Sequence, residues 1–176
     1  MKSWRVKETL ARRAIEDHGF VVHDANILFG ENCPNIDLVV YAQNNASYVQ
    51  VKSSRNPAVA DSVVIDGSPW TEGQLWHDEP IFNKHDHFRC NLVLIVDTQK
   101  LSEPDFYITP PKQLERLLLP HAREIAKRPK KDGTTRSIKF RKELPRSVLR
   151  KWRRAWDLFG KPLSFMQGIK SPGRSG

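Results

Sequence analysis

The residues with the clearest potential for chemistry are a carboxylate, an amide and an ammonium group on two neighbouring segments. Asp37 precedes Gln50 by thirteen residues, and Lys52 follows two positions later. Residues 36–41 and 47–52 are rich in β-branched and aromatic side chains, and a polar turn signal separates them, so they predict a β-hairpin. Side chains alternate along a strand, which puts Gln50 and Lys52 on one face. Asp37, near the start of the first strand, then lies across from the end of the second.

These groups can meet around one divalent cation and one water. Mg2+ is a hard cation that takes oxygen ligands, and two carboxylates with a neutral or backbone oxygen form a normal set around it. We therefore expect Asp37 to bind the metal. The side-chain oxygen of Gln50 and the carbonyl of Val51 would complete the ligands that the hairpin supplies.

Glu8 is the best candidate for the second carboxylate. It lies on an opening segment whose apolar residues recur at helical spacing, and Gly19 follows where a helix would stop. Taken alone, Glu8 would more simply form an ion pair with Arg12, four residues further along the same helix. The metal-binding interpretation depends on reading Glu8 together with the hairpin.

The order of these pieces resembles the PD-(D/E)xK, restriction-endonuclease-like superfamily of nucleases. A Glu on a first helix, a Gly-Phe pair that opens a strand eleven residues later, an Asp, and a Gln-x-Lys run follow one another along the chain. Within the superfamily, the chain is most similar to the Holliday-junction-resolvase-like branch and to small homing and restriction endonucleases. The likeness covers about the first 55 residues closely, and it continues to about residue 120 as a pattern of elements.

The resemblance implies an α/β fold with an αβββαβ core, in which a central mixed sheet is flanked by helices. The residues of the basic third predict a C-terminal hairpin and helix after this core. It also implies hydrolysis of DNA phosphodiester bonds with Mg2+, or with Mn2+ in its place. The residues that match the catalytic positions are Glu8, Asp37, Gln50 and Lys52. In such a site, Lys52 would orient the attacking hydroxide or offset charge that grows on the phosphate. A solvated edge-strand lysine is the alternative for Lys52 taken alone.

Gln50 departs from the pattern of the superfamily, which usually has an acidic residue at this position. An amide in place of a carboxylate removes a negative charge, so metal affinity should fall and Glu8 must contribute more of the ligation. A catalytically inactive DNA-binding protein of the same fold is therefore a second candidate. A third is an RNA- or protein-binding module in which the metal constellation is accidental.

Charge is segregated along the chain. Residues 112–176 contain 19 Lys and Arg against 5 Asp and Glu, whereas residues 1–111 contain 10 basic and 15 acidic residues. A basic segment of this kind attracts the phosphate backbone of nucleic acids through counterion release, whatever the base sequence. The charge pattern predicts a DNA partner and says nothing about its sequence.

Two elements of the basic third could contact DNA. Residues 136–141 alternate apolar and basic side chains, as expected for a strand. Residues 147–160 predict an amphipathic, strongly basic helix, and its packing face carries Val148, Trp152, Ala155, Trp156 and Phe159. The residues that we expect to contact phosphates are Lys84, Lys130, Lys131, Arg150, Lys151, Arg153 and Arg154.

The whole chain predicts one domain of about residues 1–162, with a core to about residue 125, a basic extension over 126–162 and a flexible tail at 163–176. No apolar stretch approaches a membrane span, and Cys33 and Cys90 read as reduced thiols. We expect a cytoplasmic, intracellular protein of a prokaryote or phage. The sequence leaves open whether two copies form a homodimer that cuts both strands.

Overall fold

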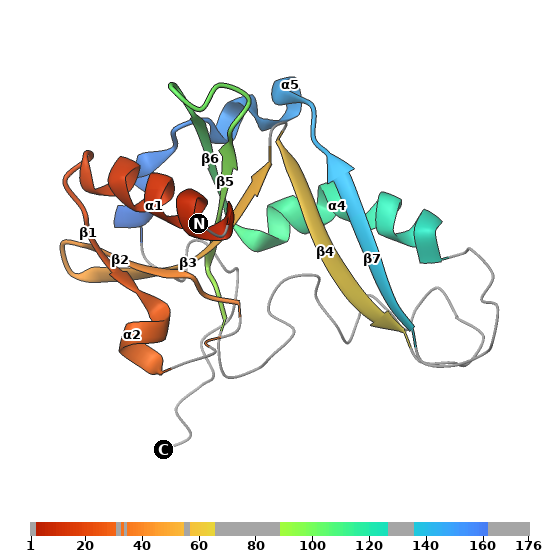
Figure 1. The fold of residues 1–176 in the computed structure, drawn as a ribbon, viewed down its shortest axis with the longest axis horizontal. Helices are drawn as coiled ribbons and strands as arrows, with labels where there is room; N and C mark the ends of the chain where they lie inside the picture. Colours follow the sequence, from red (N-terminus) through yellow and green to blue (C-terminus); the bar gives the residue numbers. More distant parts are fainter. Residues whose placement is uncertain are drawn as a thin grey trace, which may run out of the picture.

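The protein is a mixed α/β fold built on one five-stranded sheet (Figure 1). The structure is a computed structural model, and it describes residues 3–30, 33, 35–54, 57–65, 89–126 and 136–161. The helices are α1 (Ser3–Glu16), α2 (Ala25–Phe29), α4 (Pro111–Ala126) and α5 (Arg146–Leu149), with 3-10 turns η1 (Arg150–Trp152) and η2 (Trp156–Gly160). The strands are β1 (Val21–Asp24), β2 (Leu38–Ala42), β3 (Asn45–Ser54), β4 (Ala58–Ile65), β5 (Leu92–Asp97), β6 (Asp105–Thr109) and β7 (Arg136–Glu143).

The central sheet is mixed and has the strand order β1-β2-β3-β5-β6. Its first three strands are antiparallel neighbours, β3 and β5 are parallel, and β6 returns antiparallel to β5. The predicted hairpin is present, with β2 and β3 joined through Gln43 and Asn44. Gln43 has a φ of 53°, in the left-handed region that tight hairpin turns require.

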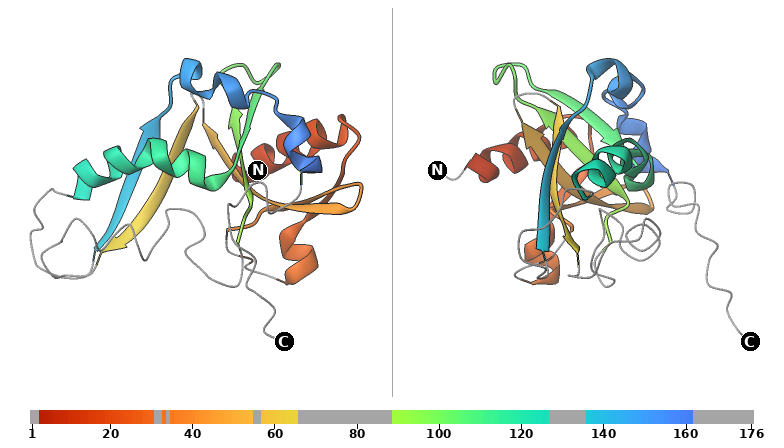
Figure 2. Two further views of the ribbon diagram at one scale, coloured as in Figure 1. Left: turned by 180° about the vertical axis from the view of Figure 1, so that it is seen from behind. Right: turned by 90° about the vertical axis from the view of Figure 1, so that its right-hand side faces the viewer.

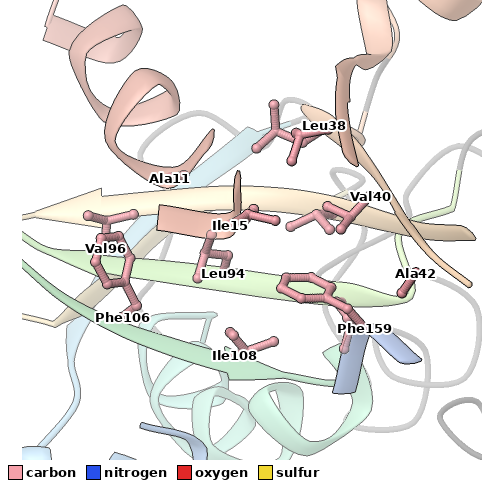
Figure 3. Close-up of a cluster of buried hydrophobic side chains, with 13 residues drawn as sticks. Ala11, Ile15, Leu38, Val40, Ala42, Leu94, Val96, Phe106, Ile108 and Phe159 are labelled. Atoms are coloured by element: carbon pink, nitrogen blue, oxygen red, sulfur yellow. The ribbon is translucent and has the colours of Figure 1, made fainter. Parts of the chain in front are cut away.

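Helix α1 covers one face of the sheet. Ala11 and Ile15 project from it onto the alternate residues of β2 and β5, such as Leu38 and Leu94, and Phe159 closes the same cluster (Figure 3). Gly19, with a φ of 83°, ends this helical segment, as the sequence predicts. The chain can then turn back into β1.

Helix α4 covers the other face. Leu114 and Leu118 pack with Val93 and Ile95 of β5, while Trp152 closes this second cluster. Figure 1 shows α1 in front of the sheet and α4 behind it, and the reverse view in Figure 2 brings α4 to the front. Because β5 is buried on both faces, its sequence is a continuous apolar run without alternation.

A two-stranded antiparallel ribbon of β4 and β7 stands beside the central sheet (Figure 1). The expectation of a hairpin within the basic C-terminal extension is wrong, because β7 pairs with β4 over the full length of both strands. Residues 136–141 do form a strand, as predicted, but its partner comes from a segment more than seventy residues earlier in the chain. Local sequence patterns do not encode a partner at that separation.

The single basic helix predicted over residues 147–160 is also wrong. The chain forms only short turns here, because Arg153 bridges to Tyr107 of β6 and the backbone N–H of Arg154 donates to the carbonyl of Phe106. These bonds to the edge of the sheet replace the helical ones. Val148 is 40% exposed, whereas Leu149 beside it and Phe159 are fully buried, so the packing residues differ in part from a helical stripe.

Within the described part of the chain, no helix has the length and apolar character that a membrane crossing requires.

The buried ring of Phe159 should matter far more for stability than the aliphatic side chain of Val148. Phe159→Ala removes a fully buried ring and should lower the free energy of unfolding by about 3–5 kcal/mol. Val148→Ala, the matched change on the same segment, should stay within about 0.5 kcal/mol of the parent. Urea denaturation of both variants measures the difference, and equal losses would contradict the packing described above.

Candidate active site

Asp37 is fixed by backbone contacts to two elements just before β2 begins. Its N–H donates to the carbonyl of Val49 at 2.8 Å, and its carbonyl accepts from the N–H of Ala25 at 3.0 Å. The side chain takes part as well, since Oδ2 accepts from the backbone N–H of Val51 at 2.6 Å. The carboxylate therefore lies against the edge of β3 at a defined position.

Gln50 and Lys52 lie on either side of Val51 in the sequence of β3. Their side chains project from the face of the strand opposite to that of the Val51 side chain. Val49 and Val51 pack in the cluster under α1, whereas Tyr48 packs in the cluster under α4. By alternation, Gln50 and Lys52 lie on the α4 side. Leu38 is paired with Val49, so Asp37 and Gln50 are the next residues along the two strands. The hairpin thus brings Asp37 next to Gln50 and Lys52, as the sequence predicts.

The side-chain oxygen of Gln50 is buried and has no hydrogen-bond partner in the described part of the chain. A buried amide oxygen without a partner is unfavourable, because it has lost its hydrogen bonds to water. Such an atom is suited to receive a bound group. Here it lies beside a carboxylate, so a cation is the group that suits both.

The surroundings of Asp37 disfavour the ionised form of its carboxyl group. Burial raises the pKa of this carboxyl above its ordinary value, and the charge of Asp24 adds to the rise. The Val51 N–H and the ammonium group of Lys52 act in the opposite direction and lower the pKa, without cancelling the effect of burial. A second positive charge near Asp37 would relieve the remaining cost.

Both cysteines lie within electrostatic reach of the same carboxylate. Burial raises the pKa of Cys33, and the charge of Asp37 adds to it. Burial also raises the pKa of Cys90, to about 12, while Lys52 lowers it and the charges of Asp37 and Glu115 raise it further. Cys90 is therefore a protonated thiol at neutral pH.

Asp24 and Glu115 are acidic residues near this site that sequence analysis did not select. Asp24 ends β1, and its Oδ1 accepts from the N–H of Asn26 as the N-cap of α2. Glu115 lies on α4 beside the buried Leu114. The position of Asp24 at the end of a strand was a usable signal, whereas nothing in the sequence fixes which face of α4 meets β3.

Glu8 lies on α1, one turn before Ala11, whose side chain packs on the face of the sheet opposite to Gln50 and Lys52. It is half-buried and takes part in an interaction of its own. It is not among the groups that shift the pKa of Asp37. The neighbouring Lys7 donates to the carbonyl of Ser53 at 3.5 Å, which places this part of α1 over the far end of β3.

Oxygen donors suited to a hard cation are present at Asp37, Gln50 and Val51. In a strand the N–H and C=O of one residue point to the same side, so the Val51 carbonyl faces the direction of its N–H, toward Asp37. Across the described residues, no group of three or more His, Cys, Asp or Glu side chains comes together as a metal site. These donors are oxygen atoms, the kind of ligand that Mg2+ prefers, and Asp37 is the one carboxylate among the three.

The residues expected to contact phosphates fall into separate groups. Lys84, Lys130 and Lys131 lie outside the described residues. Arg150 and Lys151 are exposed, and the Lys151 ammonium lies 4.6 Å from the centre of the Trp152 ring.

Arg153 and Arg154 are exposed by about half and form ion pairs with one carboxylate. Their Nε atoms lie 2.5 and 3.3 Å from the two oxygens of Asp105 at the start of β6. These two arginines are thus held at the sheet, in contrast to Arg150 and Lys151.

Comparison with known proteins gives one structural likeness. The chain is similar to a bacterial homing endonuclease, I-Ssp6803I, with 17% sequence identity, a TM-score of 0.45 and 88% of each chain covered. No family model and no curated protein matches the sequence. At this level of similarity, the function has to be argued from the residues of the site.

Asp37→Asn should stabilise the metal-free protein at neutral pH. Because the folded state raises the pKa of Asp37, ionisation costs stability as the pH rises through the ordinary and then the raised pKa, and the cost is complete above both. An asparagine pays no such cost and can still accept from the Val51 N–H. The melting temperature of the variant should exceed that of the parent at pH 7, and the gain should vanish in acid.

Asp157→Asn provides the control, since the side chain of Asp157 is 68% exposed and its carboxylate pairs with the ammonium group of Lys161 at 2.7 Å. This variant should show no gain that grows with pH. A gain for Asp37→Asn that is the same at all pH values would contradict the assigned burial of the charge.

Proposed function

We propose that this protein is a metal-dependent DNA endonuclease of the PD-(D/E)xK type. The observation that carries the proposal is the meeting of three groups at one place on the hairpin: the half-buried carboxylate of Asp37, the buried side-chain oxygen of Gln50, which has no partner among the described residues, and the ammonium group of Lys52. Each of the first two is unfavourable for the fold alone. Both become favourable beside a divalent cation, and the lysine then adds a positive group for an anionic substrate.

The metal would be held by Asp37, by the side-chain oxygen of Gln50 and by the carbonyl of Val51. A bound Mg2+ or Mn2+ ion supplies two things in such a site, namely polarisation of a phosphate and a lowered pKa for a coordinated water. The hydrogen bond from Val51 to Asp37 orients the carboxylate before any ligand arrives. The basic third of the chain supplies affinity for the DNA backbone.

Lys52 has the role of a positioning and charge-stabilising group. It projects from the same face of β3 as Gln50, two residues further on, and its charge acts on both Asp37 and Cys90. An ammonium group in this place can hold a phosphate oxygen or an attacking hydroxide by a hydrogen bond. It also offsets negative charge as the phosphate reacts.

A catalytically inactive DNA-binding protein is the second candidate function. Two observations favour it: Gln50 replaces the usual acidic residue, and no cluster of three metal-ligating acidic, His or Cys side chains forms among the described residues. Such a protein would bind DNA through its basic residues, and Asp37 would only fix the hairpin. Cleavage assays with Mg2+ and Mn2+ on duplex, branched and single-stranded DNA separate the two candidates.

Asp37→Ala should abolish cleavage while DNA affinity stays near that of the parent, because the carboxylate acts on the metal and the basic residues carry the affinity. Excess Mg2+ should raise the melting temperature of the parent, since a ligand of the folded state stabilises it, but not that of the variant. Full cleavage by Asp37→Ala would remove the site from consideration.

Lys52→Ala should keep the metal-dependent rise in melting temperature, and its cleavage rate should fall by on the order of a hundredfold or more.

Glu8→Gln and Asp24→Asn should reveal which residue provides a second carboxylate. The resemblance assigns Glu8, whereas Asp24 is the acidic group whose charge acts on Asp37. Asparagine is as good an N-cap as aspartate, so Asp24→Asn keeps α2 intact. The variant that loses the Mg2+-dependent rise in melting temperature identifies the ligand, and retention by both would leave Asp37 as the single carboxylate.

Gln50→Glu should tighten metal binding. A charge about 4 Å from a unit positive charge contributes about 1 kcal/mol in water and about 4 kcal/mol near a protein surface, so the Kd should fall by about fivefold or more. Isothermal calorimetry with Mn2+ measures the change. An unchanged Kd would place Gln50 outside the ligand set.

A further inference from the structure

A pocket of about 260 Å³ lies at the end of the sheet where β5 leads into β6. It is lined by charged and polar side chains from four segments: the end of β5, the loop between β5 and β6, the start of β6, and the C-terminal turns around α5 and η1. The lining residues are Asp97, Gln99, Lys100, Glu103, Asp105, Arg146, Arg153 and Arg154.

In one ion pair of this pocket, a single positive charge is compensated by a single negative charge. The carboxylate of Asp97 is buried, and its Oδ2 accepts from Nε and Nη2 of Arg146 at 3.0 and 2.6 Å. Arg146 also donates to the side-chain oxygen of Gln99 at 2.6 Å. This guanidinium group is committed to its partners and closes one wall of the pocket.

The second cluster is not balanced, because two arginines share one carboxylate. Arg153 and Arg154 both contact Asp105 through Nε. The cluster therefore carries one positive charge more than Asp105 can compensate. The terminal nitrogens of both arginines have no acceptor among the described residues.

The backbone at this point is held in an unusual conformation. Arg154 has a φ of 51°, which residues other than Gly and Asn seldom adopt. Hydrogen bonds to Phe106 and from Trp156 keep it there, and the result is that two consecutive side chains reach the same carboxylate. Exposed ion pairs contribute little to stability, so these two do not explain why the strain is kept.

We propose that this pocket binds a phosphodiester group of a nucleic-acid strand, held by the terminal nitrogens of Arg153 and Arg154. Asp105 orients both guanidinium groups, and the single excess charge matches the single negative charge of a phosphodiester. Planar guanidinium groups suit the tetrahedral oxygens of phosphate through paired N–H donors. That the strand is DNA rests on the proposed function.

The pocket lies on the same face of the sheet as the candidate active site. Val93 and Ile95 pack under α4 and are paired with Gln50 and Lys52, and Asp97 continues their alternation. Asp97 is four residues beyond Val93, which is about 13 Å along the strand. For a B-DNA strand that runs along β5 and rises about 3.4 Å per nucleotide, this spacing corresponds to on the order of four nucleotides between the bound phosphate and the reacting one.

The test is the salt dependence of duplex binding without divalent metal, measured in an Asp37→Ala background so that no cleavage occurs. Arg153→Gln with Arg154→Gln should reduce the slope of log K against log salt by about 0.9, the value for one phosphate contact. Arg12→Gln with Arg13→Gln removes the same charge from α1 and should leave the slope unchanged. An unchanged slope in a folded Arg153→Gln, Arg154→Gln variant would overturn the proposal.

Replacement of the same two arginines by lysine tests whether the pocket recognises phosphate through the guanidinium donors or only through positive charge. Arg153→Lys with Arg154→Lys keeps the charge and loses the paired donors, so affinity at fixed salt should fall by about tenfold. Affinity equal to that of the parent would show that the pocket has no role beyond charge and would overturn the proposal. All variants are compared with the parent by circular dichroism to establish that they are folded.

Inorganic phosphate is the probe for the other source of the same chemistry. If the Gln pair loses phosphate binding and keeps the full salt slope on DNA, the pocket takes free phosphate and the assignment to a strand fails. These measurements do not depend on cleavage. A protein that never cuts DNA but shows the expected slopes would refute the nuclease proposal and leave this one standing.

Discussion

The parallel pairing of β3 with β5 is the constraint on which the rest of the structure depends. Asn91 sets its register, because its side-chain oxygen accepts from the Tyr48 N–H at 2.6 Å while its own N–H donates to the Tyr48 carbonyl at 2.9 Å. Because Asn91 and the whole of β5 are buried, breaking these two hydrogen bonds would leave buried polar groups without partners, which is costly. A slip of one residue would exchange the two faces of β3 and bury Lys52 under α1.

Two groups at the candidate site are poorly satisfied by the fold alone. The carboxylate of Asp37 is ionised at a cost, and the oxygen of Gln50 has no partner in the described chain. Local choices in a natural sequence usually agree with the fold, so conflicts of this kind concentrate at functional sites. The strained φ of Arg154 is a third conflict, and it lies on the same face of the sheet.

The parts of the fold that the sequence predicted have a local cause. The hairpin follows from β-branched runs around a turn, β5 from an apolar run, and the end of α1 from Gly19. The errors are tertiary in origin. Residues 147–160 have helical periodicity, but the edge of β6 offers backbone partners that the periodicity does not reveal, and β7 finds its partner in β4. For the same reason the hairpin predicted the meeting of Asp37 with Gln50, while the approach of Asp24 and Glu115 depended on how α2 and α4 pack.

The fold determines where the basic C-terminal segment lies relative to Asp37. The basic C-terminal segment crosses the outer edge of β6, where Asp105 anchors Arg153 and Arg154. This brings cations to the sheet that carries Asp37, yet leaves them at its far end. A cation close to Asp37 would compete with a metal for the carboxylate, whereas one at the start of β6 attracts a polyanion without that competition. Lys52 is the single described cation whose charge acts on Asp37, so the affinity for a strand and the chemistry at the carboxylate can be set by different residues.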